Sequence, residues 1–163
     1  EGMAFDQNPP EGGQGAEVIR IRFSMVNPNE WRYDKESGFY LRWIDDEEGQ
    51  PIDLIPLVDR VNDDQLAFSN VVVIFAKHNE IQADIHDIFL WDNTDGKRAV
   101  VFRDGQAYDI NWKTPSRTQP IQLIDTDGEV FKLKHGNTWV VIMGENSDVT
   151  SVDGAWTYDF FLP

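Results

Sequence analysis

The sequence contains no cysteine. A disulfide framework, a thiolate metal site and a cysteine nucleophile are therefore all excluded. This absence does not indicate a cellular compartment, because a domain of this size can fold outside the cell without disulfides. The 163 residues fit one domain with a core large enough to be stable without cross-links.

Basic residues are also scarce. Lysine and arginine together number 14 against 29 aspartates and glutamates, which gives a formal net charge of −15. Nucleic-acid binding requires a basic surface against phosphate, and an anionic membrane surface would repel this chain. No apolar run approaches the ~20 residues needed to span a bilayer. We therefore expect no nucleic-acid partner and no direct membrane insertion, with an acidic surface that serves solubility or attracts cations and basic partners.

Recognisable catalytic motifs are missing as well. There is no Gly-x-Ser-x-Gly elbow, no GxGxxG and no phosphate-binding P-loop. Paired carboxylates of the kind used in glycoside hydrolysis remain open, because the fold sets their spacing and 29 acidic residues offer many pairs. We expect no cofactor and favour a protein without catalytic activity.

Three parts of the chain differ in composition. Residues 1–15 are rich in glycine, proline and acidic side chains, which predicts a flexible linker. Residues 16–143 contain many short apolar segments separated by turn residues and form the predicted domain. Residues 144–163 end in AWTYDFFLP, which is too aromatic for a free tail, so we expect this extension to pack or to pair as a strand.

The pattern in residues 16–143 predicts a mainly β fold. The run 70–76, NVVVIFA, is continuously apolar and predicts a central strand covered on both faces. Gly38 predicts the turn of a hairpin over 31–44, and Asp104-Gly105 predicts another. We expect an antiparallel meander of hairpins, partly barrel-like or a sandwich, and a short helix at 56–65 would make the fold α+β.

Two groups of side chains are candidate sites. Asp84 and His86 are two residues apart in a predicted strand and share one face, so with Asp87 they could hold a divalent metal. The alternative is that they are exposed polar residues. Aromatic side chains crowd the hairpin over 31–44, where they form either core or a platform for a sugar ring, peptide or protein. The candidate binding residues are Trp31, Tyr33, Tyr40, Trp43 and Trp112.

An ordered set of segments carries a resemblance to a known family. These segments are 19–23, 31–34, 38–42, 70–73, 99–105, 111–113, 125–128, 133 and 136–140. In this order they resemble the C-terminal domain of the YerB-like lipoprotein family, also called domain of unknown function 3048. The chain departs from the family pattern at 53–66 and in its extension 144–163.

The resemblance implies where the protein acts. It implies an extracytoplasmic domain at the bacterial cell envelope, lipid-anchored through a region that precedes residue 1, with the N-terminal domain of the same protein as a partner. The family offers no established catalytic residues to carry over, and a fold alone does not define a function.

The predicted function is therefore a non-catalytic binding or scaffolding domain whose partner is an envelope protein or a cell-wall glycan. Two alternatives stay open. One is an envelope glycan-acting enzyme that uses paired carboxylates. The other is a structural module of a surface assembly that self-associates by strand exchange through residues 155–163.

Overall fold

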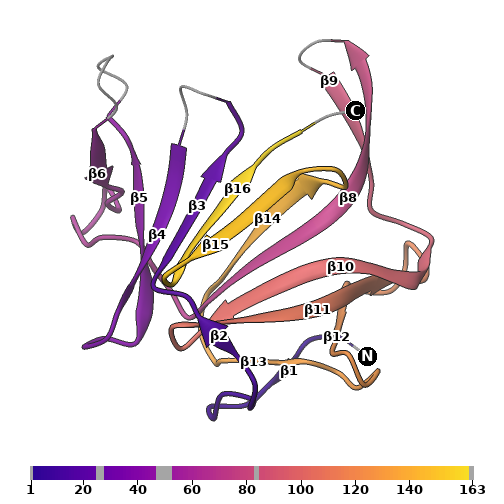
Figure 1. Cartoon of the computed structure of the whole chain (residues 1–163), viewed down its shortest axis with the longest axis horizontal. Coiled ribbons are helices and arrows are strands. Elements are labelled where there is room, and N and C mark those ends of the chain that lie inside the picture. The colour runs from indigo at the N-terminus through magenta and orange to yellow at the C-terminus, as the bar shows by residue number, and fades with distance from the viewer. Residues whose placement is uncertain (1, 25–27, 47–52, 83–84, 162–163) are drawn as a thin grey trace.

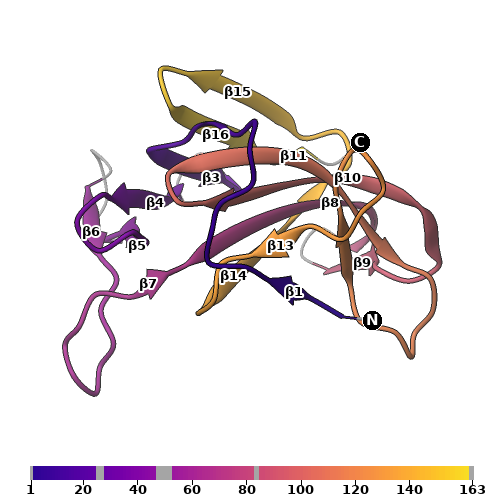
Figure 2. The ribbon, with the colours of Figure 1, turned by 90° about the horizontal axis from the view of Figure 1, so that it is seen from below.

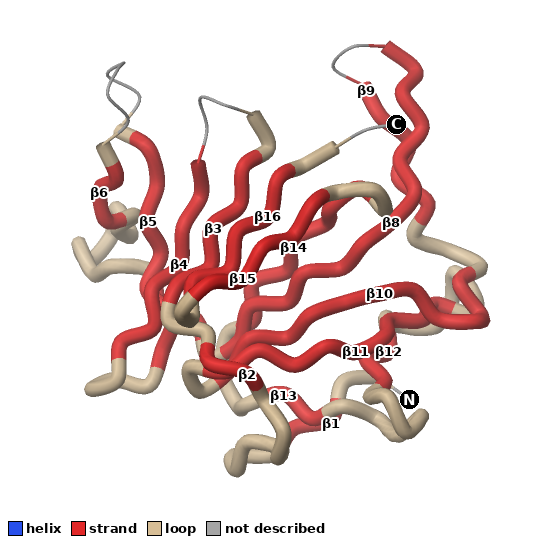
Figure 3. The backbone as a smooth tube through the Cα atoms, viewed as in Figure 1, coloured by secondary structure: helices blue, strands red, loops and turns tan. Residues whose placement is uncertain are grey.

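The computed structural model describes residues 2–24, 28–46, 53–82 and 85–161. Every regular element within these residues is a strand, and none is a helix (Figure 3). The prediction of a mainly β fold is confirmed. The predicted short helix at 56–65 is wrong: β6 (Leu54–Pro56) and a bridge between Val58 and Gln65 occupy this segment. Asp59 accepts the backbone N–H of Val61 at 2.8 Å, a local contact that competes with helix formation.

The strands form two large open sheets (Figure 1). The first sheet has the order β12 (Gln122–Ile124), β11 (Gln106–Thr114), β10 (Asn93–Arg103), β8 (Asn70–Gln82) and β14 (Thr138–Gly144), with β2 (Gln14–Gly15) beside β11 and β9 (Ile85–Phe89) beside β8. The second sheet has the order β15 (Asp148–Val152), β16 (Ala155–Asp159), β3 (Val18–Arg22), β4 (Pro28–Asp34), β5 (Phe39–Asp45) and β6, with β7 (Ala67–Phe68) beside β5. A separate parallel pair joins β1 (Ala4–Phe5) to β13 (Lys132–Leu133).

The core has two layers, one on each face of the first sheet. Val71, Val73 and Phe75 of β8 pack between the sheets against residues of β3, β4 and β16. The intervening Val72 and Ile74 point to the opposite face and join a second cluster. This alternation confirms that the continuous apolar run is a central strand buried on both sides.

The second core layer is covered by the segment between β11 and β14. Leu123, Phe131 and Leu133 of this segment are buried against the outer face of the first sheet. Figure 2 shows β1 and β13 on the opposite side of that sheet from β3 and β16. The molecule is thus an open sandwich of sheets with a partial third layer of loops and short strands.

The predicted hairpin turns form where expected. Gly38 adopts a φ of 73° between β4 and β5, and Asp104 and Gly105 adopt φ angles of 53° and 71° between β10 and β11. Two consecutive positive φ angles are the geometry of a type I′ turn. The start of β10 is irregular, because its register with β11 shifts between Asn93 and Lys97.

Both ends of the chain pair with the domain. Residues 1–15 were predicted as a flexible linker, but β1 and β2 within them pair with β13 and β11. The backbone groups of this segment find partners in the sheet, which fixes it in place. In the extension 144–163, β16 pairs with both β15 and β3, and its Trp156 and Tyr158 are buried.

Candidate functional site

A cleft of about 590 Å³ opens between the N-terminal segment and the outer side of the first sheet. Residues 6–14 form one wall, β11 forms the base, and residues 125–132 form the other wall. The cleft exists because the N-terminal segment is held at both ends, by β1 on β13 and by β2 on β11. It is therefore a feature of tertiary pairing rather than of any one element.

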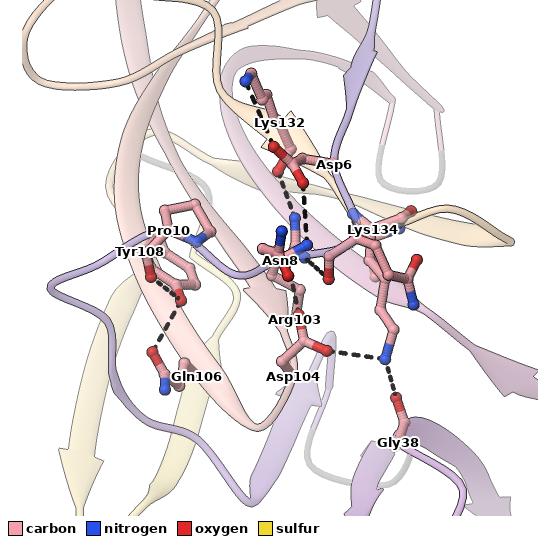
Figure 4. Close-up of polar contacts among 12 residues, drawn as sticks. Asp6, Asn8, Pro10, Gly38, Arg103, Asp104, Gln106, Tyr108, Lys132 and Lys134 are labelled. Atoms are coloured by element: carbon pink, nitrogen blue, oxygen red, sulfur yellow. Dashed lines mark hydrogen bonds and ion pairs between the residues drawn. The ribbon is translucent and has the colours of Figure 1, made fainter.

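Hydrogen bonds hold the N-terminal wall between these two short strands. The backbone N–H of Asp6 donates to the carbonyl of Leu133 at 2.9 Å. The Tyr108 hydroxyl donates to the carbonyl of Pro10 at 2.9 Å (Figure 4). Arg103 Nη2 donates to the carbonyl of Gln7 at 3.2 Å. The wall is thus fixed at three points by the residues beneath it.

Arg103 is the centre of a buried ionic network (Figure 4). Its Nε donates to Asp104 at 2.8 Å, and its Nη1 donates to the carbonyl of Lys132 at 2.8 Å. Asp104 also pairs with Lys134 Nζ at 2.8 Å, and this ammonium donates to the carbonyl of Gly38 at 3.0 Å. The network joins the β10–β11 turn, β13 and the β4–β5 turn. Each of the three nitrogens of the fully buried Arg103 guanidinium has a hydrogen-bond partner.

The base of the cleft is apolar and aromatic. The rings of Tyr108 and Phe131 lie 5.3 Å apart between centroids, with Ile110 beside them in the lining. Burial raises the pKa of Tyr108, so the hydroxyl keeps its proton and remains a hydrogen-bond donor. The hydroxyl oxygen of Tyr108 lies 2.8 Å from Gln106 Oε1 and 2.9 Å from the carbonyl oxygen of Pro10. The base is therefore formed by two tilted and largely buried aromatic rings, with the hydroxyl of Tyr108 already hydrogen-bonded.

The rim of the cleft is acidic. One basic residue, Lys132, is part of the lining, and its Nζ lies 3.5 Å from Oδ2 of Asp6. The backbone N–H of Asn8, with a further contribution from Lys132, lowers the pKa of Asp6. Asp125 accepts the backbone N–H groups of Asp127 and Glu129 at 3.0 and 2.9 Å, which shapes the opposite wall. The carboxylates that line the cleft are Asp6, Glu11, Asp125 and Asp127, whereas the side chain of Asp109 points to the opposite face of β11, which it shares with Ala107.

The predicted aromatic residues do not line this cleft. Trp31, Tyr40 and Trp112 are buried, with exposures of 1%, 0% and 0%, and form part of the core. Tyr33 and Trp43 are half-buried. Binding through Tyr33 and Trp43 stays a prediction, whereas the other three contribute mainly to packing.

The predicted metal residues are only partly brought together. Asp84 lies outside the described residues. Asp87 is opposite Asn79 in the β8–β9 register, and His86 is opposite Glu80, so Asp87 and His86 point to opposite faces of the hairpin. The residue that approaches His86 is His78, at 6.0 Å between ring centroids. Among the residues that the structure describes, no three histidine or carboxylate side chains gather to hold a metal.

The cleft residues were missed because the N-terminal wall was predicted to be a linker. A glycine- and proline-rich composition predicts irregular backbone, but it does not predict whether that backbone is anchored. The one available signal was Phe5, an aromatic residue in an otherwise polar stretch. Its ring stacks on His135 at 5.5 Å, and it belongs to the strand that starts the wall.

Comparisons with known proteins place the fold. In the described part of the chain, no helix is long and apolar enough to cross a membrane. A search of curated proteins finds no match. The crystal structure of the YerB protein from Bacillus subtilis is similar, with a TM-score of 0.61 and 24% sequence identity. The match covers 86% of this chain and 43% of that chain, so this chain corresponds to less than half of YerB, and at this identity the likeness shows the fold alone.

The family match covers most of the chain. The model of the C-terminal domain of the protein of unknown function DUF3048 matches residues 19–140, which run from β3 into β14. The N-terminal wall of the cleft and the strands β15 and β16 lie outside the matched residues, whereas β11 and the 125–132 wall lie within them. The chain belongs to the DUF3048 C-terminal domain family.

Proposed function

We propose that this chain is a non-catalytic binding domain of a bacterial cell-envelope lipoprotein, and that its cleft binds a lysine- or arginine-bearing segment of an envelope protein. The observation that carries this proposal is the combination of an aromatic base with a rim of four carboxylates in one cleft. A long basic side chain has the matching structure, an apolar stem that ends in a cation.

The size of the cleft suits such a ligand. A volume of about 590 Å³ lies within the range of small-ligand sites, ~300–1,000 Å³. The stem of a lysine or arginine would lie against Tyr108 and Phe131, and its charged end would reach the carboxylates of Glu11 or Asp127 at the rim. A neutral glycan would gain the stacking contact but not the ionic one, which is why we favour a basic peptide over a glycan.

The rigidity of the cleft favours binding as well. The ionic network of Arg103 and the hydrogen bonds of Asp6 and Tyr108 fix the N-terminal wall before a ligand arrives. A preformed site loses less conformational entropy on binding than a flexible one. The acidic net charge of the whole chain would also speed the encounter with a basic partner at low salt.

The proposed cellular setting rests on family membership. The chain resembles a lipoprotein family, and its match spans less than half of the similar YerB chain. These observations support a domain within a longer protein of the envelope, anchored by lipid outside the residues of this chain. The other domain of such a protein is a second proposed partner.

The test is a calorimetric titration with tri-lysine peptide, tri-alanine peptide and soluble peptidoglycan fragments. We expect tri-lysine to bind, with an affinity that falls as salt rises, and tri-alanine not to bind. The double variant Glu11→Gln, Asp127→Asn should weaken binding at least about fivefold, whereas Asp148→Asn, on β15 of the other sheet, should not. Preferential binding or turnover of the glycan fragments would overturn the proposal in favour of a glycan-acting domain.

A further inference from the structure

A pair of histidines lies on the β8–β9 hairpin, away from the cleft. Figure 1 shows this hairpin extending beyond the other strands of the first sheet. In the register, His78 is opposite Ile88 and Glu80 is opposite His86. Directly opposed residues share a face, and so do residues two apart, so His78, Glu80 and His86 all lie on one face of the hairpin.

Three of the four ring nitrogens of this pair are buried without a close hydrogen-bond partner, and the backbone of Met143 lies near the His78 ring. Both Nδ1 and Nε2 of His78 are buried without a partner, and so is Nε2 of His86. A buried polar atom without a partner costs free energy, and such atoms are rare in folded proteins. Here three of them come from two imidazoles whose ring centroids are 6.0 Å apart. Two imidazoles this close together, with unpartnered nitrogens, are suited to be two ligands of one metal ion.

The surroundings of His78 combine an ionic and an aromatic neighbour. Burial, with a smaller contribution from His86, lowers the pKa of His78. The Glu145 carboxylate acts in the opposite direction and is itself paired with Lys97. The ring of Phe160 packs edge-on against His78 at 5.2 Å between centroids and shields it from water.

We propose that His78 and His86 bind one divalent transition-metal ion, with Cu²⁺ bound more tightly than Zn²⁺. Imidazole suits both ions, and Cu²⁺ has the higher affinity for a given set of nitrogen ligands. Rotation of the two rings about χ2, a soft torsion for histidine, turns one nitrogen of each toward a shared ion. Water completes the coordination, because no third histidine or carboxylate side chain joins the pair among the residues that the structure describes.

The site is independent of the proposed cleft function. A bound ion would join β8 to β9 near the end of the hairpin and stabilise a region that exposes Ile81, Ile85 and Phe89. Since two histidines supply the protein nitrogens, the affinity should be lower than that of a closed structural zinc site with four protein ligands.

The experiment measures metal binding to the whole chain in a non-coordinating buffer. Cu²⁺ is followed by its visible absorption, and Zn²⁺ by competition with a chromogenic indicator. We expect one equivalent of each ion to bind and to raise the melting temperature. His78→Gln and His86→Gln should each weaken binding at least about tenfold, since even outer-shell partners of a metal are worth ~10–100-fold. His135→Gln is the matched control, because that ring stacks on Phe5 and belongs to another part of the molecule.

Two results would overturn the proposal. One is equal binding by the wild type, His78→Gln and His86→Gln, which would place any bound ion on the acidic surface. The other is no binding at all, which would mean that the two rings only pack against each other and Phe160. His86 is less enclosed than His78, so His86→Gln keeps the test valid if His78→Gln does not fold.

Discussion

The guanidinium of Arg42 stacks on the indole of Trp31 inside the sandwich, with its carbon 4.2 Å from the ring centroid. The ring of Trp139 lies on a second side at 5.4 Å. The nitrogens of this guanidinium donate to the carbonyls of Glu30 and Trp43 and to the side-chain oxygen of Asn29. Burial lowers the pKa of Arg42 to about 10, so it is still protonated at neutral pH. A cation is thus held in the core by aromatic rings and carbonyl groups.

Replacing this cation should destabilise the protein strongly. Arg42→Ala leaves three buried acceptors without their donor and removes the contact with two indoles, at a cost of about 3 kcal/mol in the free energy of unfolding. Arg42→Lys keeps the charge but loses the planar fork, so its effect should be intermediate. Urea unfolding measures both. The control is Arg117→Ala, at an exposed position, which should change the free energy of unfolding by no more than ~0.5 kcal/mol. If Arg42→Ala lowered the free energy of unfolding by no more than this control does, the account would be contradicted.

The ionic network under the cleft makes a second prediction. Asp104→Asn keeps a side chain that tolerates the positive φ of 53° but leaves the buried Arg103 without its carboxylate. Breaking a buried ion pair in this way costs about 3–5 kcal/mol. Since Arg103 also holds Gln7, amide hydrogen exchange in residues 6–14 should accelerate more than in β16. Unchanged exchange in that wall would mean that the network does not hold the cleft.

Two buried tyrosines provide a matched comparison. The Tyr40 hydroxyl donates to the carbonyl of Ala16 at 3.0 Å, whereas the Tyr158 hydroxyl is buried with no partner. Tyr40→Phe should therefore lower the free energy of unfolding by about 1 kcal/mol. Tyr158→Phe should leave it unchanged or raise it, because the variant no longer buries an unpaired hydroxyl. Denaturant titration measures the free energy of unfolding of both variants. Equal losses in Tyr40→Phe and Tyr158→Phe would refute the prediction.

The same two residues determine how stability changes at high pH. Burial raises the pKa of both Tyr40 and Tyr158 well above the ordinary value of 10.0. The folded protein keeps these protons while the unfolded chain loses them, so their contribution is complete below pH 10 and declines as the pH rises above it. The slope should be about 1.4 kcal/mol per pH unit for each tyrosine. Urea unfolding between pH 8 and 11 should show this decline, and it should be smaller in Tyr40→Phe, Tyr158→Phe.

Much of the fold could be predicted from the local sequence. The apolar run 70–76 predicted a strand buried on both faces, and Gly38 and Asp104-Gly105 predicted two hairpin turns, because these signals are local and have one dominant structural cause. The helix at 56–65 was a wrong prediction. There the side chains of Asp59 and Asn62 accept nearby backbone N–H groups and form turns instead.

The candidate site could not be predicted in the same way. The cleft depends on two short strand pairs that join residues about a hundred positions apart in the sequence, Ala4 with Lys132 and Gly15 with Gln106. Because β1 and β2 have only two residues each, the sequence shows no hydrophobic periodicity from which these pairings could be predicted. The strand spacing predicted His86 as a candidate metal ligand, which stays a prediction, but its approach to His78 depends on the register of the hairpin.

The most direct test of the central claim is to map the binding surface by nuclear magnetic resonance. Backbone amide shifts are recorded while tri-lysine peptide is added to the labelled chain at low salt. The account predicts progressive shifts in residues 6–14, in β11 and in 125–132, with little change in β15, β16 and the β4–β5 hairpin. Shifts confined to the second sheet, or scattered over the whole acidic surface, would contradict a binding function for the cleft.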